Sequence, residues 1–64
     1  MIRVNGVDHP HVDEYVDQLV ARMGIEPRGI AVAIDGEIVR RSTWATMRVL
    51  DGNVVEIVTA AAGG

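Results

Sequence analysis

The stretch from residue 30 to residue 40, IAVAIDGEIVR, decides the fold. Two runs rich in Val and Ile are separated by Asp35-Gly36, a pair that tolerates the positive φ angles of a two-residue β-turn. The stretch therefore predicts a β-hairpin. Because side chains alternate between the two faces of a strand, we expect one set to face the core and the other to face away. The expected inward residues are Val32 and Ile34, and the expected outward residues are Ala31 and Ala33.

A second hairpin is predicted at the start of the sequence. Residues 1–4 alternate apolar and polar side chains, and Asn5-Gly6 follows them as a strong signal for a tight turn. We therefore expect one strand over residues 1–4 and a short return strand over residues 7–9.

An amphipathic helix is predicted over residues 10–23. Pro10 suits the first turn of a helix, where its missing N–H is not needed, and Asp13 and Glu14 suit the positive end of the helix dipole. Gly24 is expected to end the helix in a left-handed conformation. The apolar stripe that repeats at helical spacing consists of Val12, Val16, Leu19, Val20 and Met23.

A single helical turn is predicted over residues 42–46. Ser42 is the expected cap of this turn, because a serine side chain at that position can accept a hydrogen bond from the first free backbone N–H groups. Trp44 is expected to cover one end of the core.

The last strand is predicted over residues 54–59, VVEIVT, after a turn at residues 51–53. Its alternation places two apolar side chains inward and two side chains outward. The predicted order of elements is therefore strand, strand, helix, strand, strand, turn, strand. The expected inward residues are Val55 and Ile57, and the outward ones are Glu56 and Val58.

The composition favours one small domain with an ordinary apolar core. The chain has 64 residues, of which 48% are hydrophobic, and it has no Cys and two His. The formal net charge is -3, and the six basic residues, all Arg, are scattered and form no stripe that could follow a nucleic-acid backbone. No apolar run is long enough to span a bilayer, and no signal-peptide pattern is present. We therefore expect a cytoplasmic protein with neither nucleic-acid nor membrane partners.

A short uncharged tail, AAAGG, follows the last strand over residues 60–64. Three Ala residues cannot nucleate a helix in water, so we expect a flexible tail on a domain formed by residues 1–59. From Thr59 outward, six extended residues would reach roughly 20 Å, far enough to enter the active site of another protein. Gly63 and Gly64 would fit a channel too narrow for a Cβ atom. Taken alone, the Gly-Gly ending is a weak signal.

The element order and the Gly-Gly ending together resemble the ubiquitin-like β-grasp fold. More closely, residues 28–64 resemble the thiamine-biosynthesis sulfur carrier family, ThiS, in which an Arg-Ser-x-Trp step, here residues 41–44, separates the family from ubiquitin. The resemblance implies an α+β fold with a mixed sheet of four to five strands and one main helix packed on one face. The matching segments are residues 29–35 (GIAVAID), 38–45 (IVRRSTWA), 50–52 (LDG), 55–60 (VEIVTA) and 63–64 (GG).

Three features depart from the family pattern. Arg40 stands where the family commonly has Pro, and Asn53 stands where it commonly has Asp. Residues 7–11 form a shorter connection than usual, so little second strand is expected at this edge of the sheet.

The resemblance implies that Gly64 is a substrate and carrier and that the chain is not itself an enzyme. The Gly64 carboxylate would be adenylated by a ubiquitin-activating-like enzyme that uses ATP and Mg²⁺, and a cysteine desulfurase would supply the sulfur of the resulting thiocarboxylate. In the thiamine pathway this sulfur goes to thiazole synthase. Gly63 would supply clearance, and the chain would need no cofactor of its own.

A docking face for the partners is expected on the outward side of the sheet, beside the tail. Small apolar side chains there permit close approach of another protein, and an exposed apolar patch commonly marks a partner site. Arg28 or Arg41 would border it. The expected docking residues are Ala31, Ala33, Val58, Ala60 and Ala62.

Other interpretations of the residues remain open. Asp8, His9, His11 and Asp13 are metal-ligating types, but their spacing matches no helical or closed ligand pattern. His11 with Asp13 or Glu14 could form an acid–base pair of an enzyme, although no nucleophile or glycine-rich phosphate loop accompanies it. The activated carboxylate could also form isopeptide bonds, as ubiquitin does, or serve a cysteine, molybdopterin or secondary-metabolite pathway.

Overall fold

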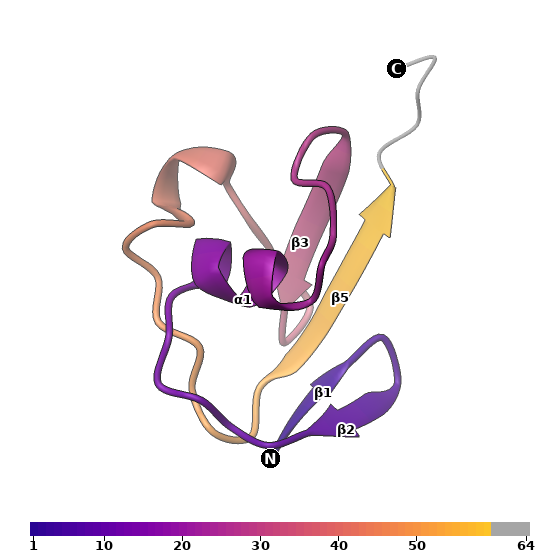
Figure 1. The fold of residues 1–64 in the computed structure, drawn as a ribbon, viewed down its shortest axis with the longest axis vertical. Coiled ribbons are helices and arrows are strands. Elements are labelled where there is room, and N and C mark those ends of the chain that lie inside the picture. The colour runs from indigo at the N-terminus through magenta and orange to yellow at the C-terminus, as the bar shows by residue number, and fades with distance from the viewer. Residues whose placement is uncertain (60–64) are drawn as a thin grey trace.

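The computed structural model describes residues 1–59, which form one five-stranded mixed sheet and one α-helix (Figure 1). The strand order is β2-β1-β5-β3-β4, so β5 lies at the centre, parallel to β1 and antiparallel to β3. This arrangement confirms the predicted fold class and element order. The elements are β1 (Ile2–Val4), β2 (Val7–His9), α1 (Val16–Arg22), β3 (Ile30–Ile34), β4 (Glu37–Val39), the 3-10 helix η1 (Arg41–Thr43) and β5 (Val54–Thr59).

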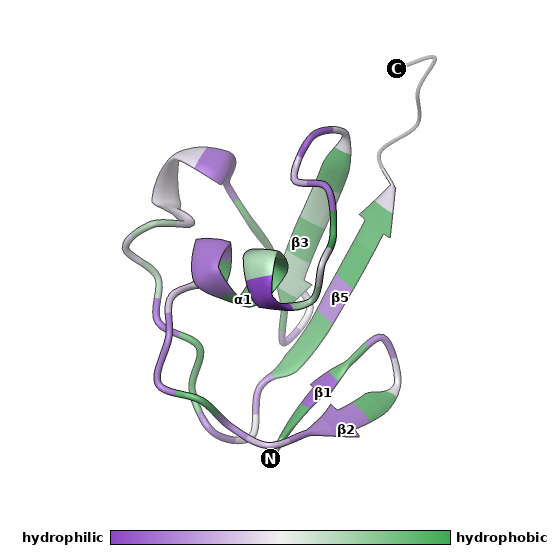
Figure 2. Ribbon diagram, viewed as in Figure 1, coloured by the Kyte–Doolittle hydropathy of each residue, from purple (hydrophilic) through white to green (hydrophobic). Residues whose placement is uncertain are grey.

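The core lies between α1 and one face of the sheet, which we call the inner face. Figure 2 shows that β3 and β5, the strands beneath the helix, are largely hydrophobic. Their side chains alternate as predicted, because every second residue is buried against the helix. The buried apolar residues are Ile2, Val4, Val16, Leu19, Val20, Val32, Ile34, Val39, Trp44, Val49, Val55 and Ile57.

Both predicted hairpins are confirmed. Asn5 and Gly6 have φ angles of 49° and 83°, and Asp35 and Gly36 have φ angles of 50° and 85°, which is the geometry of two-residue hairpin turns. The short connection after Gly6 still forms three paired residues of β2, so the edge strand is present although it is small.

The predicted start of the helix at residue 10 is wrong, because α1 begins at Val16. The backbone before it pairs with a distant segment instead: Val16 N donates to Met47 O at 2.9 Å, and Val49 N donates to Glu14 O at 2.9 Å. Val12, which fitted the helical stripe, is 40% exposed. This tertiary pairing satisfies backbone groups that a longer helix would have used, and it overrides the local pattern.

The end of the helix agrees with the sequence, whereas the predicted serine cap does not. Gly24 follows the helix with a φ of 72°, the left-handed conformation expected there. Ser42 lies inside η1 rather than at its cap, because Arg40 is the residue that precedes the first turn. Trp44 is 4% exposed and donates its Nε1–H to Val39 O at 3.0 Å, so its predicted place at one end of the core is confirmed.

Candidate functional site

Strand β5 leads directly to the tail that the sequence singled out. It is hydrogen-bonded on both sides along the sheet, and its last residue, Thr59, lies opposite Ile30 at the beginning of β3. The predicted tail residues follow immediately and lie outside the described residues, so the structure tests neither the tail nor the domain boundary at residue 59. These residues include Ala60, Ala62, Gly63 and Gly64.

The outer face is the side of the sheet opposite α1, and it brings together the predicted docking residues that the structure describes. Ala31 lies directly opposite Val58, on the neighbouring strand, and Ala33 lies two residues farther along β3. Ala31 and Ala33 are half-buried by their neighbours, while Val58 is 55% exposed.

Two further apolar residues of this face were not among the predicted docking residues. Ile38 lies opposite Ala33 on β4 and is 70% exposed, and Val54 lies on β5 and is 44% exposed. The two-residue turn fixes the pairing of β3 with β4, so the hairpin register was the signal that could have identified Ile38. We define the outer apolar patch as Ala31, Ala33, Ile38, Val54 and Val58.

The two arginines proposed to border this face are engaged elsewhere. Arg41 donates from its Nη2 to Pro27 O, and its guanidinium lies 4.3 Å from the ring centroid of Trp44. Arg28 is highly exposed, and its Nε lies 3.5 Å from Glu26 Oε1. Arg41 is therefore a support for Trp44 and the adjoining loop.

Asn5 fixes the position of β5 beyond the point where β1 ends. Its side chain donates from Nδ2 to Ile57 O at 3.0 Å and accepts from Ile57 N at 2.8 Å at Oδ1. These two bonds continue the parallel pairing of β1 with β5 by one step, using a side-chain amide in place of a peptide group. Sequence reasoning identified Asn5 only as a turn residue.

The residues of the alternative acid–base and metal interpretations are separated by their own contacts. Asp13 pairs with Arg48, Glu14 pairs with Arg22 at 2.7 Å, and the His11 Nε2 lies 2.9 Å from Val49 O. Among residues 1–59, no group of three or more His, Asp or Glu side chains is placed to hold a metal ion. These contacts tie the segment before α1 to the rest of the domain, and they pair Asp13 and Glu14 with arginines instead of with His11.

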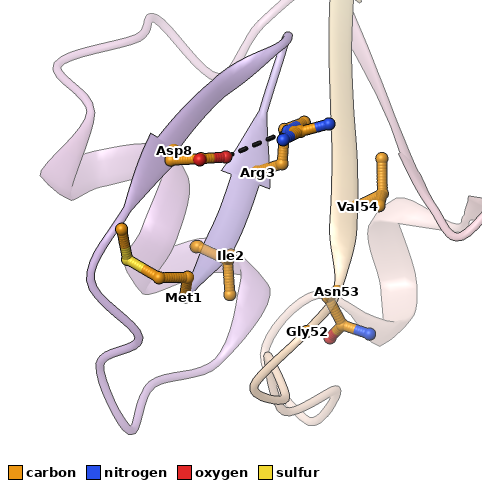
Figure 3. Close-up of a pocket in the computed structure, with 7 residues that line it drawn as sticks. All are labelled: Met1, Ile2, Arg3, Asp8, Gly52, Asn53 and Val54. Atoms are coloured by element: carbon orange, nitrogen blue, oxygen red, sulfur yellow. Dashed lines mark hydrogen bonds and ion pairs between the residues drawn. The ribbon is translucent and has the colours of Figure 1, made fainter.

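A shallow hollow of about 250 Å³ lies where β1 and β5 begin (Figure 3). The Arg3 Nε lies 2.9 Å from Asp8 Oδ1 at its upper side, and Val54 borders it from β5. The hydrogen bond and the charge of Arg3 lower the pKa of Asp8 below its ordinary value. Among the residues that line the hollow, no nucleophile lies beside a base.

The helical part of the described chain gives no candidate for a membrane span, because no helix there has the necessary length and apolar character.

The central β5, the single helix across one sheet face and the exposed apolar patch on the other define a protein of the ubiquitin-like β-grasp class. The model of the ThiS family matches residues 2–64, and the chain belongs to this family. Family membership supports a sulfur carrier role in thiamine biosynthesis.

Solved structures agree with this fold. The chain is similar to the crystal structure of the thiamine biosynthesis protein ThiS from Geobacter metallireducens, with a TM-score of 0.85 and 24% identity over 98% of this chain and 97% of that one. It is also similar to a solution NMR structure of a thiamine biosynthesis protein from the same organism, with a TM-score of 0.75 and 24% identity over 98% of this chain and 86% of that one. No curated protein matches the chain significantly.

Proposed function

We propose that this chain is a sulfur carrier that holds sulfur as a thiocarboxylate on Gly64 and delivers it for the synthesis of the thiamine thiazole. The observation that carries the proposal is the ThiS family match, which extends over residues 2–64 and so includes Gly63 and Gly64. The position of β5 supports it, because the central strand runs directly into residues 60–64 and carries Val58 of the outer apolar patch.

The chemistry requires activation because a carboxylate repels nucleophiles and lacks a leaving group. In the first step, a Gly64 carboxylate oxygen attacks the α-phosphorus of ATP, and pyrophosphate leaves. The terminal sulfur of a cysteine persulfide then attacks the acyl carbon, and AMP leaves. A second thiol breaks the S–S bond of this adduct, which releases the thiocarboxylate and leaves a disulfide on the donor side.

The chain itself contributes a substrate and a docking surface to these steps. A ubiquitin-activating-like enzyme would bind ATP and Mg²⁺, a cysteine desulfurase would supply the persulfide, and thiazole synthase would accept the sulfur. Gly63 would leave room for the backbone in a narrow channel, because glycine lacks a Cβ atom. On this proposal the protein is not an enzyme and needs no cofactor of its own.

The length of the tail provides the decisive test. Deleting Gly64, or adding one residue after it, should abolish thiocarboxylate formation, because the activated carbon would no longer reach the same point in the adenylating enzyme. The melting temperature should stay nearly unchanged, because all contacts among residues 1–59 remain. The measurement is intact mass after incubation with the adenylating enzyme, ATP and a sulfur source, which detects the exchange of one oxygen for sulfur.

The matched control is Ala61→Gly, which changes the tail composition at a residue outside the expected docking set but keeps the tail length and its final Gly-Gly. This variant should be thiocarboxylated like the wild type. Thiocarboxylation of the deletion or extension variant would show that the position of Gly64 does not matter and would contradict the assignment. Covalent adducts on target lysines instead of a thiocarboxylate would identify a protein modifier, and transfer of sulfur to an acceptor other than thiazole synthase would change the pathway.

A further inference from the structure

One charged residue lies in the middle of the outer apolar patch. Glu56 is exposed on β5, and the patch residues Val54 and Val58 lie two positions away on the same face of the same strand. Ala33 lies directly opposite Glu56 on β3, and Ile38 lies opposite Ala33 one strand farther out. The carboxylate is therefore bordered by apolar side chains along its own strand and across the sheet.

In the part of the chain that the structure describes, no cation pairs with this carboxylate. Within residues 1–59, the ion pairs of exposed carboxylates join Asp8 to Arg3, Asp13 to Arg48, Glu26 to Arg28 and Asp51 to the N-terminal ammonium group, while no cation lies within ion-pair distance of Glu56. The strand pairing places Arg3 of β1 opposite Val54, two residues before Glu56 on β5. The Arg3 side chain is already paired, because its Nε lies 2.9 Å from Asp8 Oδ1.

The position of Glu56 limits what can cover this face. Any occupant that removes the patch from water also removes the carboxylate from water, and an unpaired buried charge is costly. A second copy stacked on this face about a two-fold axis would bring two Glu56 side chains toward each other, and the net charge of -3 on each copy adds to the repulsion. A purely apolar occupant would leave the charge unpaired. The suitable occupant is an apolar protein surface that carries a cation.

We propose that the outer face docks on the adenylating enzyme through an apolar surface of that enzyme that presents one arginine or lysine side chain to Glu56. This inference rests on the proposed function, because it assigns the face to the enzyme that would receive the tail. Residues 60–64 reach at most roughly 17 Å beyond Thr59 when extended, so the protein that holds Gly64 also lies close to the end of β5. The small side chains of Ala31 and Ala33 leave space beside the carboxylate for a long cationic side chain to lie flat on the sheet.

The ion pair between Glu56 and the cation of the enzyme would contribute to specificity as well as to affinity. The apolar patch would provide most of the buried area, whereas the ion pair would fix the register in which the two surfaces meet. A competing β-grasp protein with an apolar or positive residue at the position of Glu56 would leave the cation of the enzyme unpaired or repelled, and would therefore be rejected.

The test compares two carboxylates of the same sheet, Glu56 on β5 and Glu37 on β4. Glu56→Gln keeps the size of the side chain and removes its charge, and Glu56→Lys reverses the charge. Glu37→Gln is the matched control, because Glu37 is also exposed but pairs in register with Ile34, a residue of the inner face. Binding to the adenylating enzyme from the same organism is measured by isothermal titration calorimetry at low and high salt. The thermal unfolding of each variant is measured first, to establish that it is folded.

We expect Glu56→Gln to raise the Kd by at least about 30-fold, because it leaves the cation of the enzyme buried and unpaired. Glu56→Lys should raise it further, whereas Glu37→Gln should change it by less than about twofold, as expected for a charge outside the interface. The wild-type Kd should rise with salt more steeply than the Kd of Glu56→Gln. A charge-reversal variant of the enzyme at the paired arginine or lysine should restore binding of Glu56→Lys.

Failure of this inference and failure of the proposed function are distinguishable. A third variant, Val58→Asp, places a charge in the outer apolar patch and is measured in the same way. If Glu56→Gln and Glu56→Lys bind like the wild type while Val58→Asp binds poorly, the face docks without the ion pair and the inference is wrong. If all three variants bind normally, the enzyme uses another surface and the inference is also wrong. A wild-type dimer that forms through this face at the assay concentration would overturn it by identifying a second copy as the occupant. Absence of thiocarboxylate on the wild-type chain would instead refute the proposed function itself.

Discussion

The two faces of the sheet carry similar residues in different surroundings. On β5, Val55 is completely buried beneath α1, while its neighbours Val54 and Val58 are 44% and 55% exposed on the other side. The inner face is closed by the helix and Trp44, whereas the outer face has no covering element within residues 1–59. Stability therefore depends on the inner side of the strand, and we propose that recognition uses the outer side, so mutations should separate the two.

The largest expected effect is on the inner face, and the same substitution at the adjacent residue provides its control. Val55→Ala should reduce the free energy of unfolding by about 2 to 3 kcal/mol, because it deletes buried methyl groups and leaves a cavity. For a domain of this size that loss lowers the melting temperature by roughly 10 to 20 °C. Val54→Ala should reduce the free energy of unfolding by about 1 kcal/mol or less, because its side chain is 44% exposed and its removal leaves no enclosed cavity. Thermal unfolding followed by circular dichroism measures both.

Both substitutions lower the β-propensity of the strand in the same way, so the difference between them isolates burial. Equal destabilisation by Val54→Ala and Val55→Ala would show that the outer face is covered in solution, and the contrast between the two faces would then be lost. Weaker binding of Val54→Ala to the adenylating enzyme, at unchanged stability, would support a role of the outer face in binding.

The strands could be predicted from the sequence because their signals are local. Asn5-Gly6 and Asp35-Gly36 each fixed a hairpin, and the alternation within residues 54–59 correctly separated the inward from the outward side chains. The outer patch was predicted only in part. Ile38 is assigned to the outer face only by the register of the β3–β4 hairpin, which pairs it with Ala33.

The beginning of the helix could not be predicted because a long-range contact decides it. Residues 10–15 carry a helical spacing, but the backbone of Glu14 and Val16 pairs with the segment at residues 47–49. The capping role given to Ser42 is wrong because η1 begins at Arg41, which places Ser42 inside the turn. The chemistry assigned to Gly64 remains a prediction, because it depends on residues that the structure does not describe and on proteins outside this chain.

A smaller loss of stability is expected from substitution of Asn5, whose side chain helps to hold β5 in register with β1. A one-residue slip of β5 would exchange its inner and outer side chains, and the two hydrogen bonds between Asn5 and Ile57 oppose such a slip. Asn5→Gly should reduce the free energy of unfolding by about 1 to 2 kcal/mol, because both bonds are lost. Glycine is chosen because it accepts the φ of 49°, whereas alanine would add backbone strain. Urea unfolding measures the stability, and hydrogen exchange of the Ile57 amide reports the local opening.

Asn5→Asp is the control for this prediction. It keeps the acceptor for the Ile57 N–H but places a carboxylate oxygen where Nδ2 donated to the Ile57 carbonyl, and because these two oxygens repel each other Asn5→Asp should be less stable than the wild type. Wild-type stability and full protection of the Ile57 amide in Asn5→Gly would mean that the side chain does not hold β5.

The smallest effect is expected from the Arg3–Asp8 pair, which lies at the edge of the outer face. The hydrogen bond and charge of Arg3 lower the pKa of Asp8 below its ordinary value of 3.8. A carboxyl group whose pKa is lower in the folded state stabilises the fold above its ordinary pKa, and it loses this contribution as the pH falls through the folded-state pKa. The wild type should therefore be slightly more stable than Asp8→Asn at pH 6, and the difference should vanish progressively below about pH 4.

The difference between the two proteins is the quantity to measure, because Asp51 also has a lowered pKa, caused by its hydrogen bond to the N-terminal ammonium group. Urea unfolding of both proteins at several pH values cancels this common contribution. Both side chains of the pair are more than half exposed, so added salt should reduce the difference at pH 6 as well. A difference that is independent of pH would show that the Asp8 charge does not stabilise the fold. A small difference that disappears in acid would confirm that even the ion pair on the outer face contributes little to stability, which leaves that face free to be optimised for recognition.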